Sequence, residues 1–209
     1  MTKEKKSNGM AADGWRILET HYPYRDEWIA LRSEKVQLPD ETILQAYHTI
    51  EFPDWVNVIA LTPDFDIILA EQYRHPVRKL MVEFPAGAVD DGEEPLAAIK
   101  RELLEETGYA SDEWYLLGSC DANPARQTNH LHSYLALRAR KVGKQSLGHG
   151  EFIRTHLVHW KDFRARIDSG ISDLPAMHFA CLVWLESFAK NSPDLTIRQL
   201  AGASRSGTD

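Results

Sequence analysis

One stretch, residues 87–109, constrains this chain more than any other part of its sequence. It reads GAVDDGEEPLAAIKRELLEETGY and contains the pattern G-x5-E-x7-R-E-U-x-E-E-x-G-U, where U is a bulky apolar residue. The fixed positions are Gly87, Glu93, Arg101, Glu102, Glu105, Glu106 and Gly108. Average residue frequencies give a chance match about once in 10^8 start positions. Coincidence therefore explains the pattern poorly.

The spacing predicts a helix over residues 95–107. Pro95 suits the first helical turn, where its missing N–H has no intrahelical partner, and Gly108 suits the left-handed position just after the last turn. Apolar residues three and four positions apart form a stripe that should pack on a core. They are Leu96, Ile99 and Leu103. The helix is therefore expected to be anchored on one side.

Three carboxylates share another face of this helix, because Glu102, Glu105 and Glu106 lie at i, i+3 and i+4. Like charges at this spacing destabilise a helix unless a cation lies among them, and Mg²⁺ prefers oxygen ligands. A solvated acidic face is the alternative, but Arg101 is placed to hold one of the carboxylates. Glu93 is expected either to cap the helix or to pair with Arg101. The pattern favours a metal site.

The complete pattern resembles the signature box of the Nudix hydrolases. This resemblance implies an α/β fold, an α/β/α sandwich with a mixed sheet, and hydrolysis of a nucleoside diphosphate linked to another group, with Mg²⁺ or Mn²⁺ as cofactor. It also implies that Glu102, Glu105 and Glu106 ligate metal, helped by a main-chain carbonyl near Ala86 or Gly87.

Residues 68–87, ILAEQYRHPVRKLMVEFPAG, resemble the lead-in of the ADP-ribose and nucleotide-sugar pyrophosphatase branch. In that branch the arginine matching Arg74 contacts substrate phosphate, and Glu83 belongs to the same substrate-binding lead-in. Pro124 stands near the position of a proline in that branch. Arg126, in the loop after it, is a candidate to reach a distal phosphate or ribose.

The loop before residues 152–158 departs from this branch. It reads SLGHGE, so Glu151 is its acidic residue, whereas the branch carries more than one. We carry Glu151 over as metal ligand or general base. His149 is the alternative base, since histidine can do base work at neutral pH, or a solvent-exposed loop residue. The catalytic residues expected from the resemblance are Arg101, Glu105, Glu106 and Glu151.

The expected reaction is cleavage of a nucleoside diphosphate linked to a sugar, with ADP-ribose giving AMP and ribose 5-phosphate. GDP-mannose or another nucleotide sugar is the alternative substrate, followed by dinucleotides. A non-catalytic nucleotide-sugar sensor is the alternative class. The retained box carboxylates favour the enzyme.

Composition agrees with an enzyme that acts on a small molecule. The chain has 209 residues and a net charge of -7, which gives no basic footprint for nucleic acid. Its two cysteines, Cys120 and Cys181, follow no metal or redox spacing and are expected to be reduced thiols in a cytoplasmic protein. There is no signal-like segment and no apolar run of membrane-spanning length, so no membrane association is expected.

The chain is expected to divide into two folded parts with mobile ends. A small antiparallel sheet with a turn at Pro39-Asp40 resembles the N-terminal domain that pairs subunits in ADP-ribose pyrophosphatases, which implies a homodimer. The expected divisions are a disordered N-terminus (1–13), this β subdomain (14–52), the catalytic domain (53–200) and a disordered tail (201–209).

Three further patterns complete the expectation. VNVIALTP and DIILAEQYR predict strands paired about Asp64. LPAMHFACLVWLESFAK predicts a closing helix with Leu174, Met177, Ala180, Cys181, Val183 and Trp184 on its core face. The histidine pairs His130-x-His132 and His156-x-x-His159 lack the cysteines or H-E-x-x-H helix of a zinc site, so none is predicted.

Overall fold

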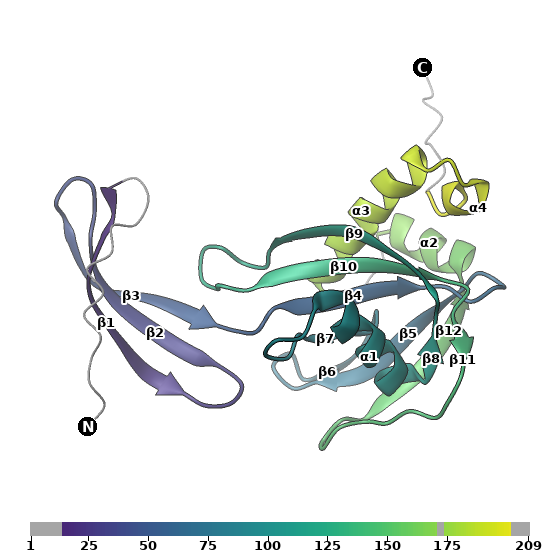
Figure 1. Cartoon of the computed structure of the whole chain (residues 1–209), viewed down its shortest axis with the longest axis horizontal. Coiled ribbons are helices and arrows are strands. Elements are labelled where there is room, and N and C mark those ends of the chain that lie inside the picture. The colour runs from purple at the N-terminus through teal and green to yellow at the C-terminus, as the bar shows by residue number, and fades with distance from the viewer. Residues whose placement is uncertain (1–13, 171–173, 202–209) are drawn as a thin grey trace. The chain divides into compact units, whose positions relative to one another are not determined.

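The computed structural model describes residues 14–170 and 174–201 (Figure 1). The chain divides into two compact units. The first contains the residues up to Pro53 together with Asp121–His130, and the second contains Asp54–Cys120 and the residues from Leu131 onward. The ends predicted to be disordered, 1–13 and 201–209, lie outside the described residues except for Ala201.

The first unit is a three-stranded antiparallel sheet in the order β1-β2-β3. Its strands are β1 (Arg16–Arg25), β2 (Ala30–Gln37) and β3 (Ile43–Glu51). The turn between β2 and β3 is closed by Asp40, whose Oδ1 accepts a hydrogen bond from the Thr42 N–H at 3.0 Å. The loop 121–130 joins this sheet, since Ile50 N–H donates to the Arg126 carbonyl at 2.8 Å. The predicted N-terminal sheet is confirmed.

The second unit contains three sheets, ordered β7-β4-β10-β9, β12-β5-β6 and β11-β8. The first is mixed, because β4 runs parallel to β10 and antiparallel to β7. The strands are β4 (Trp55–Ala60), β5 (Asp66–Arg74), β6 (Lys79–Glu83), β7 (Ala86–Ala88), β8 (Tyr109–Ala110), β9 (Glu113–Asp121), β10 (His130–Leu137), β11 (Arg140–Lys141) and β12 (Ile153–His159).

Helices cover both faces of the mixed sheet (Figure 1). They are α1 (Pro95–Thr107), α2 (Trp160–Asp168), α3 (Ala176–Asn191) and α4 (Leu195–Arg198). One buried cluster joins α1 to β4 and β10, and the other joins α2, α3 and α4 to β4, β5 and β10. The predicted α/β/α sandwich is confirmed.

Helix α1 begins and ends where its sequence predicts. Pro95 occupies the first turn, and Gly108 follows the helix with φ 69°, donating its N–H to the Leu104 carbonyl at 2.7 Å. Ile99 and Leu103 are fully buried, each worth about 1.5–3 kcal/mol of transfer free energy. Leu96 is 38% exposed, so its predicted core position is wrong. It shares the face of Ile99 and Leu103 but lies in the first turn, at the exposed end of the apolar stripe.

The predicted pairing of residues 56–63 with 66–74 about Asp64 is wrong. Only an isolated bridge joins the two segments, between Leu61 and Ile67. The chain turns at Phe65, which has φ 61°, and β5 then pairs with β12 and β6 in another sheet. Both strands are apolar along most of their length, so their patterns do not distinguish a hairpin from a crossing between sheets.

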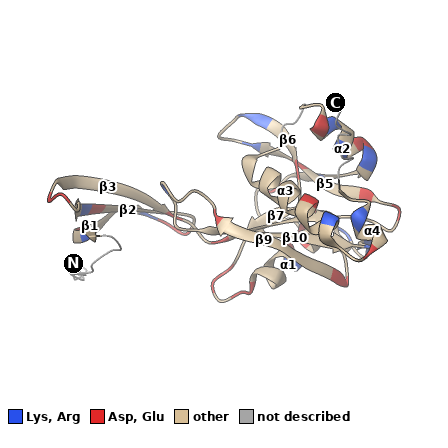
Figure 2. Cartoon of the chain, turned by 90° about the horizontal axis from the view of Figure 1, so that it is seen from above, with Lys and Arg blue, Asp and Glu red and all other residues tan. Residues whose placement is uncertain are grey.

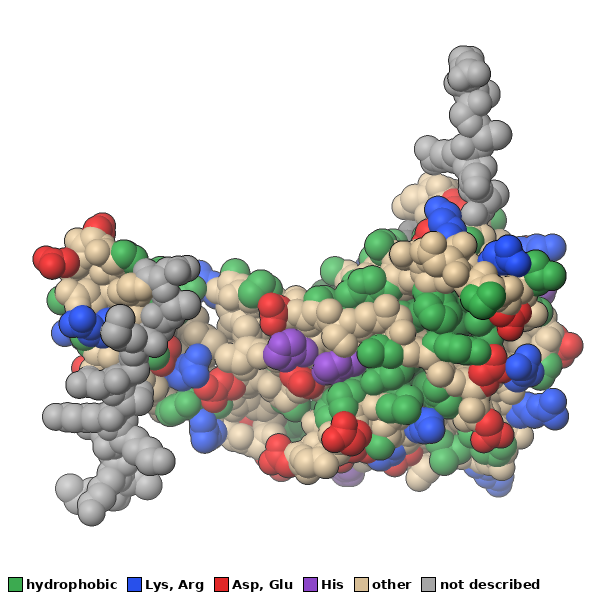
Figure 3. Space-filling model, turned by 45° about the horizontal axis from the view of Figure 1, so that its top comes forward, with side chains coloured by type: hydrophobic (Ala, Val, Ile, Leu, Met, Phe, Trp, Pro, Cys, Tyr) green, Lys and Arg blue, Asp and Glu red, His purple; other side chains and the backbone are tan. Residues whose placement is uncertain are grey.

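Helix α3 is present, but its buried face differs from the predicted one. The buried residues are His178, Cys181, Leu182, Leu185 and Ala189. Of the predicted core residues, Val183 is 67% exposed. Apolar residues occupy nearly every side of this helix, so spacing alone cannot select a face. Figure 3 shows hydrophobic side chains gathered at the surface over the part of the second unit that contains α3 and β9.

No helix within residues 14–170 and 174–201 combines the length and hydropathy needed to cross a bilayer. Both cysteines are free thiols, Cys120 exposed and Cys181 buried, as the sequence predicts. Burial raises the pKa of the Cys181 thiol to about 12, so this group stays protonated at neutral pH.

Candidate active site

Helix α1 presents its three carboxylates at graded depth. Glu106 is 5% exposed, whereas the side chains of Glu102 and Glu105 are 14% and 42% exposed. The buried residues Ile99 and Leu103 hold the helix against β4 and β10, which fixes where the acidic face stands. Figure 2 shows that acidic positions are spread over this unit and that basic positions gather at the turn before β6 and on α2.

Glu106 is the most deeply buried carboxylate of the set. Its Oε2 accepts a hydrogen bond from the Ala86 N–H at 3.2 Å. Burial, together with the neighbouring charges of Glu102 and Glu151, raises the pKa of Glu106 to about 8. The carboxylates of Glu102, Glu106 and Glu151 therefore interact electrostatically, and Glu106 is hydrogen-bonded to the backbone of β7.

Gly87 provides the space that the carboxylate of Glu102 occupies. A Cβ built at Gly87 would stand 2.1 Å from Oε1 of Glu102, so any side chain there would force Glu102 away. Burial raises the pKa of Glu102, and Arg101 opposes this rise. Strand β7 therefore approaches α1 with its bare backbone, which explains why the pattern begins with glycine.

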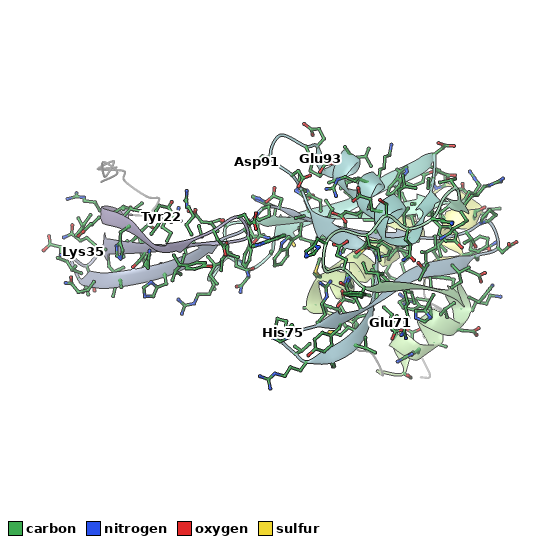
Figure 4. All side chains as sticks on the ribbon, turned by 90° about the horizontal axis from the view of Figure 1, so that it is seen from below. Tyr22, Lys35, Glu71, His75, Asp91 and Glu93 are labelled. Atoms are coloured by element: carbon green, nitrogen blue, oxygen red, sulfur yellow. The ribbon has the colours of Figure 1, made fainter. Side chains whose placement is uncertain are left out.

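Arg101 joins the loop before α1 to the carboxylates of the helix. Its Nε and Nη2 donate to Glu93 at 3.1 and 2.8 Å, and its Nη1 donates to Glu102 at 2.8 Å and to Glu105 at 3.3 Å. Nη2 also donates to the Ala88 carbonyl at 3.1 Å. The carboxylates of Glu93 and Glu102 raise the pKa of Arg101. Glu93, on the loop labelled in Figure 4, thus pairs with Arg101.

Arg74 and Glu83 form a two-pronged ion pair across β5 and β6. Arg74 Nε lies 3.1 Å from both Glu83 oxygens, and Nη2 lies 2.5 Å from Oε2. Glu83 is 1% exposed, whereas the Arg74 side chain is 42% exposed. The Arg74 charge also acts on Glu106, opposing the rise of its pKa. The structure therefore brings together Arg74 and Glu83, two of the three predicted substrate-binding residues, with the Arg74 charge within reach of Glu106.

Glu151 lies in the loop before β12 and is held by that loop. Its Oε2 accepts a hydrogen bond from the Gly148 N–H at 2.7 Å, and its own N–H donates to the Gly148 carbonyl at 3.2 Å. Its charge acts on Glu102 and Glu106. His149 is an exposed neighbour. Arg126 belongs to the first unit, and its predicted substrate contact stays a prediction.

The residues of this site fit a divalent cation by their chemistry. Within the described ranges, no three His, Cys, Asp or Glu side chains stand in position to hold a metal ion, and Glu102 and Glu105 contact Arg101. The donor set is nevertheless all oxygen, as hard cations require. Burial disfavours the ionised form of Glu106, and the single hydrogen bond from the Ala86 N–H does not compensate for this. A cation would relieve this cost.

The sequence did not predict two features near this site, a cavity and a buried histidine. A cavity of about 600 Å³ adjoins β7 and is lined in part by Trp55, Met81 and Met177. Below it, His178 is fully buried with its ring 4.9 Å from that of Phe84, and burial lowers the pKa of His178 to about 3. In the sequence, the local signal of this buried environment is a histidine within an otherwise apolar helix.

Comparison with known proteins finds a family profile that matches residues of the second unit and relatives that match about two thirds of the chain. The profile of the NUDIX domain family matches residues 52–175. The methanol dehydrogenase activator of Bacillus methanolicus is 32% identical over 66% of this chain and 75% of its own length. The ADP-ribose pyrophosphatase of Bacillus subtilis (strain 168) is 31% identical over 68% of this chain and 76% of its own.

A solved structure described as the crystal structure of ADP compounds hydrolase has a similar fold. Its TM-score is 0.72 at 17% identity, covering 83% of this chain and 93% of that one. This likeness concerns the fold. The profile match and the relatives show that the chain belongs to the Nudix family of hydrolases. The predicted family and hydrolase class are confirmed, and hydrolases of this family generally need a divalent metal ion.

Proposed function

We propose that this chain hydrolyses the pyrophosphate bond of a nucleoside diphosphate linked to a sugar, and that ADP-ribose, cleaved to AMP and ribose 5-phosphate, is its main substrate. The observation that carries this is the packing of the Glu102 and Glu106 carboxylates against the backbone of Ala86 and Gly87. The relative named ADP-ribose pyrophosphatase supports the choice of substrate. GDP-mannose and other nucleotide sugars are the alternatives.

The proposed cofactor is Mg²⁺ or Mn²⁺. Glu102, Glu105, Glu106 and Glu151 would hold it, with the Ala86 carbonyl. When bound, the cation supplies positive charge that offsets the charge of the pyrophosphate. The oxygen donors and the depth of Glu106 support this assignment.

Arg74 and Arg101 take different parts in the proposed mechanism. The half-exposed Arg74 guanidinium neutralises a non-bridging phosphate oxygen, and Glu83 orients it through the two-pronged pair. Arg101 holds the carboxylates of Glu102 and Glu105 in place. Arg126 is proposed to contact a distal phosphate or the ribose.

The proton of the attacking water passes to a base in the loop before β12. Glu151 is the proposed base, supported by its electrostatic coupling to Glu102 and Glu106. His149 is the second candidate and has an exposed side chain. The pH profiles of kcat/KM for Glu151→Gln and His149→Gln distinguish the two candidates. The profile of one variant should lose the acidic limb, which reports titration of the base, and the residue replaced in that variant is the base.

The first unit supports the proposal of a homodimer. Its sheet leaves large apolar side chains exposed, among them Tyr22, Tyr24 and Trp28. Burying such surface is the usual drive for association. Analytical ultracentrifugation tests this, and a monomer at micromolar concentration would contradict it. A cytoplasmic location is proposed from the free thiols Cys120 and Cys181.

A coupled phosphatase assay tests the function directly. The panel comprises ADP-ribose, ADP-glucose, GDP-mannose, UDP-glucose, NADH, diadenosine polyphosphates and coenzyme A, each with Mg²⁺ and with EDTA. Cleavage of ADP-ribose that depends on metal is the expected result. Cleavage of no member would contradict the proposal.

A regulatory role is the second candidate. One relative is named as an activator of methanol dehydrogenase. Saturable binding of one panel member without cleavage would favour regulation over catalysis.

A further inference from the structure

A second cavity lies along β9, at the edge of the mixed sheet opposite β7. Its volume is about 550 Å³, within the range of about 300–1,000 Å³ typical of small-molecule sites. Its walls come from β9, from the second half of α3, and from α4 with the turn before it. The described residues that line it include none from α1 and none that line the cavity beside β7, so it is a separate site.

Three aromatic side chains, which together form an aromatic cage, line this second cavity. Tyr115 lies on β9, and Trp184 and Phe188 lie one turn apart on the same face of α3. The rings of Tyr115 and Phe188 pack against each other, with centroids 5.4 Å apart and planes inclined by 51°. The two rings therefore form an angled wall, which a rounded group can touch on both sides and a flat base cannot.

The rings of the cage are held in place by the core and by β9. A Cβ built at Gly118 would stand 2.5 Å from the indole of Trp184, so the bare backbone of β9 leaves room for this ring. Tyr115 and Phe188 pack against the buried cluster that joins α2, α3 and α4 to the sheets. The apolar surface over α3 and β9 is visible in Figure 3. The cage is thus formed before any ligand enters.

The second cavity carries a negative charge. Among the described residues that line it, the one charged side chain is Asp194. Its Oδ1 accepts a hydrogen bond from the Thr196 N–H at 2.7 Å, which holds the carboxylate at the start of α4. The Arg198 guanidinium donates to the Pro193 carbonyl at 3.3 Å, and no lysine or arginine of the described ranges forms an ion pair with Asp194. The Asp194 charge acts on Tyr115, so it reaches the cage.

We propose that the aromatic cage binds a small quaternary ammonium compound, of which choline is a simple form. A cation over the face of an aromatic ring is attracted by the electrons of that ring. A quaternary ammonium carries its charge without N–H groups, so it gives up no hydrogen bond on entering an apolar cavity, whereas a primary amine does. Asp194 adds attraction for a cation and opposes an anion.

The test compares choline with tert-butylethanol, the neutral analogue in which a carbon atom replaces the nitrogen. Each compound is titrated into the isotope-labelled chain, and the NMR signal of the Trp184 indole N–H is followed, with Trp184→Phe identifying that signal. Choline should shift it saturably, with a Kd on the order of 1 mM or below, and the neutral analogue should bind about tenfold more weakly. Equal affinity of the two compounds, or no saturable shift with choline at millimolar concentrations, would overturn the proposal.

Asp194→Asn tests the charge without removing the helix cap, because the amide oxygen can still accept the Thr196 N–H. It should weaken choline binding by about threefold or more and leave the neutral analogue unchanged. Asp91→Asn removes an exposed carboxylate outside this cavity and should leave choline binding unchanged. Choline binding of wild-type strength in Asp194→Asn would overturn the role given to this carboxylate.

Phe188→Leu tests the rings, because it keeps apolar bulk and removes one aromatic face. It should weaken choline binding by about tenfold. Phe179→Leu is the matched control, since Phe179 is a 39% exposed residue of the same helix and does not line the cavity. Equal choline affinity in these two variants would overturn the proposal, and thermal unfolding of each shows whether the fold is kept.

The titrations need neither a nucleotide nor a metal ion, so they are independent of the proposed hydrolase function. Failure of the chain to cleave any nucleotide would leave the quaternary ammonium site standing. Failure of choline to bind would remove this site and leave the hydrolase proposal intact.

Discussion

The carboxylate of Glu102 lies where a side chain on Gly87 would stand, 2.1 Å from the position of a Cβ. Gly87→Ala should therefore displace Glu102 and lower kcat for ADP-ribose by about 100-fold, as misplacement of a catalytic group by roughly 1 Å does. The flexible end of a glutamate can move aside, so the free energy of unfolding should fall by less than about 1 kcal/mol. Steady-state kinetics and urea unfolding measure the two effects.

Gly143→Ala is the matched control for this variant, because a Cβ there meets nothing within 4 Å. It should leave both kcat and stability near the wild-type values. Wild-type turnover in Gly87→Ala would show that the close approach of β7 to Glu102 has no catalytic role.

Glu106→Gln tests the buried carboxylate. The amide oxygen can still accept the Ala86 N–H, so the fold should persist while turnover falls by about 100-fold or more. Without metal and above about pH 8, where Glu106 is ionised, the variant should unfold at a higher temperature than the wild type, because a buried charge near Glu102 and Glu151 is removed. Differential scanning calorimetry in EDTA measures this.

Asp91→Asn serves as the control for Glu106→Gln, since Asp91 is an exposed acidic residue of the loop before α1 (Figure 4). It should change neither property. Near-wild-type turnover in Glu106→Gln would remove the proposed metal-binding role of Glu106.

The sequence predicted α1 and its carboxylates well because local rules decide them. Pro95, Gly108 and the glutamate spacing act within one helix, where periodicity and end signals are strong. The core face of α3 and the pairing of β5 depended instead on partners far away along the chain. The cavity was missed for the same reason, since Trp55 and Met177 meet only in the folded unit.

Arg101→Lys should reduce stability by about 1–3 kcal/mol, because an ammonium cannot reproduce the planar contacts of Arg101 with Glu93, Glu102 and Ala88. Turnover should fall too, since Glu102 and Glu105 lose a shared partner. Urea unfolding checks the stability. Arg138→Lys alters a surface pair with Glu113 and is expected to cost less; an equal cost would contradict the role given to Arg101.

His178 should make stability depend on pH. Its pKa is lowered in the folded chain to about 3, mainly by burial, from the ordinary histidine value of 6.5. The unfolded chain therefore binds the proton first, and this contribution to stability is complete above about pH 6.5 and lost as pH falls toward 3. The free energy of unfolding should fall by up to about 1.4 kcal/mol per pH unit in this window.

Urea unfolding between pH 7 and pH 4 measures that slope for the wild type and for His178→Gln. The variant lacks the titrating ring, so its slope should be shallower. His75→Gln replaces an exposed histidine and should keep the wild-type slope. Parallel slopes for the wild type and His178→Gln would contradict the assignment.

The first unit is discontinuous in sequence, because Asp121–His130 joins β1, β2 and β3 through Ile50 and Gln127. During synthesis its three strands leave the ribosome well before residue 127, so Ile50 waits for its partner until β9 has been made. A chain shortened to begin at Asp54 would lose β1, β2 and β3 but keep Asp121–His130, the other segment of this unit. That segment would then lack its partner strand β3. The first unit can therefore complete its contacts only after much of the second unit has been made.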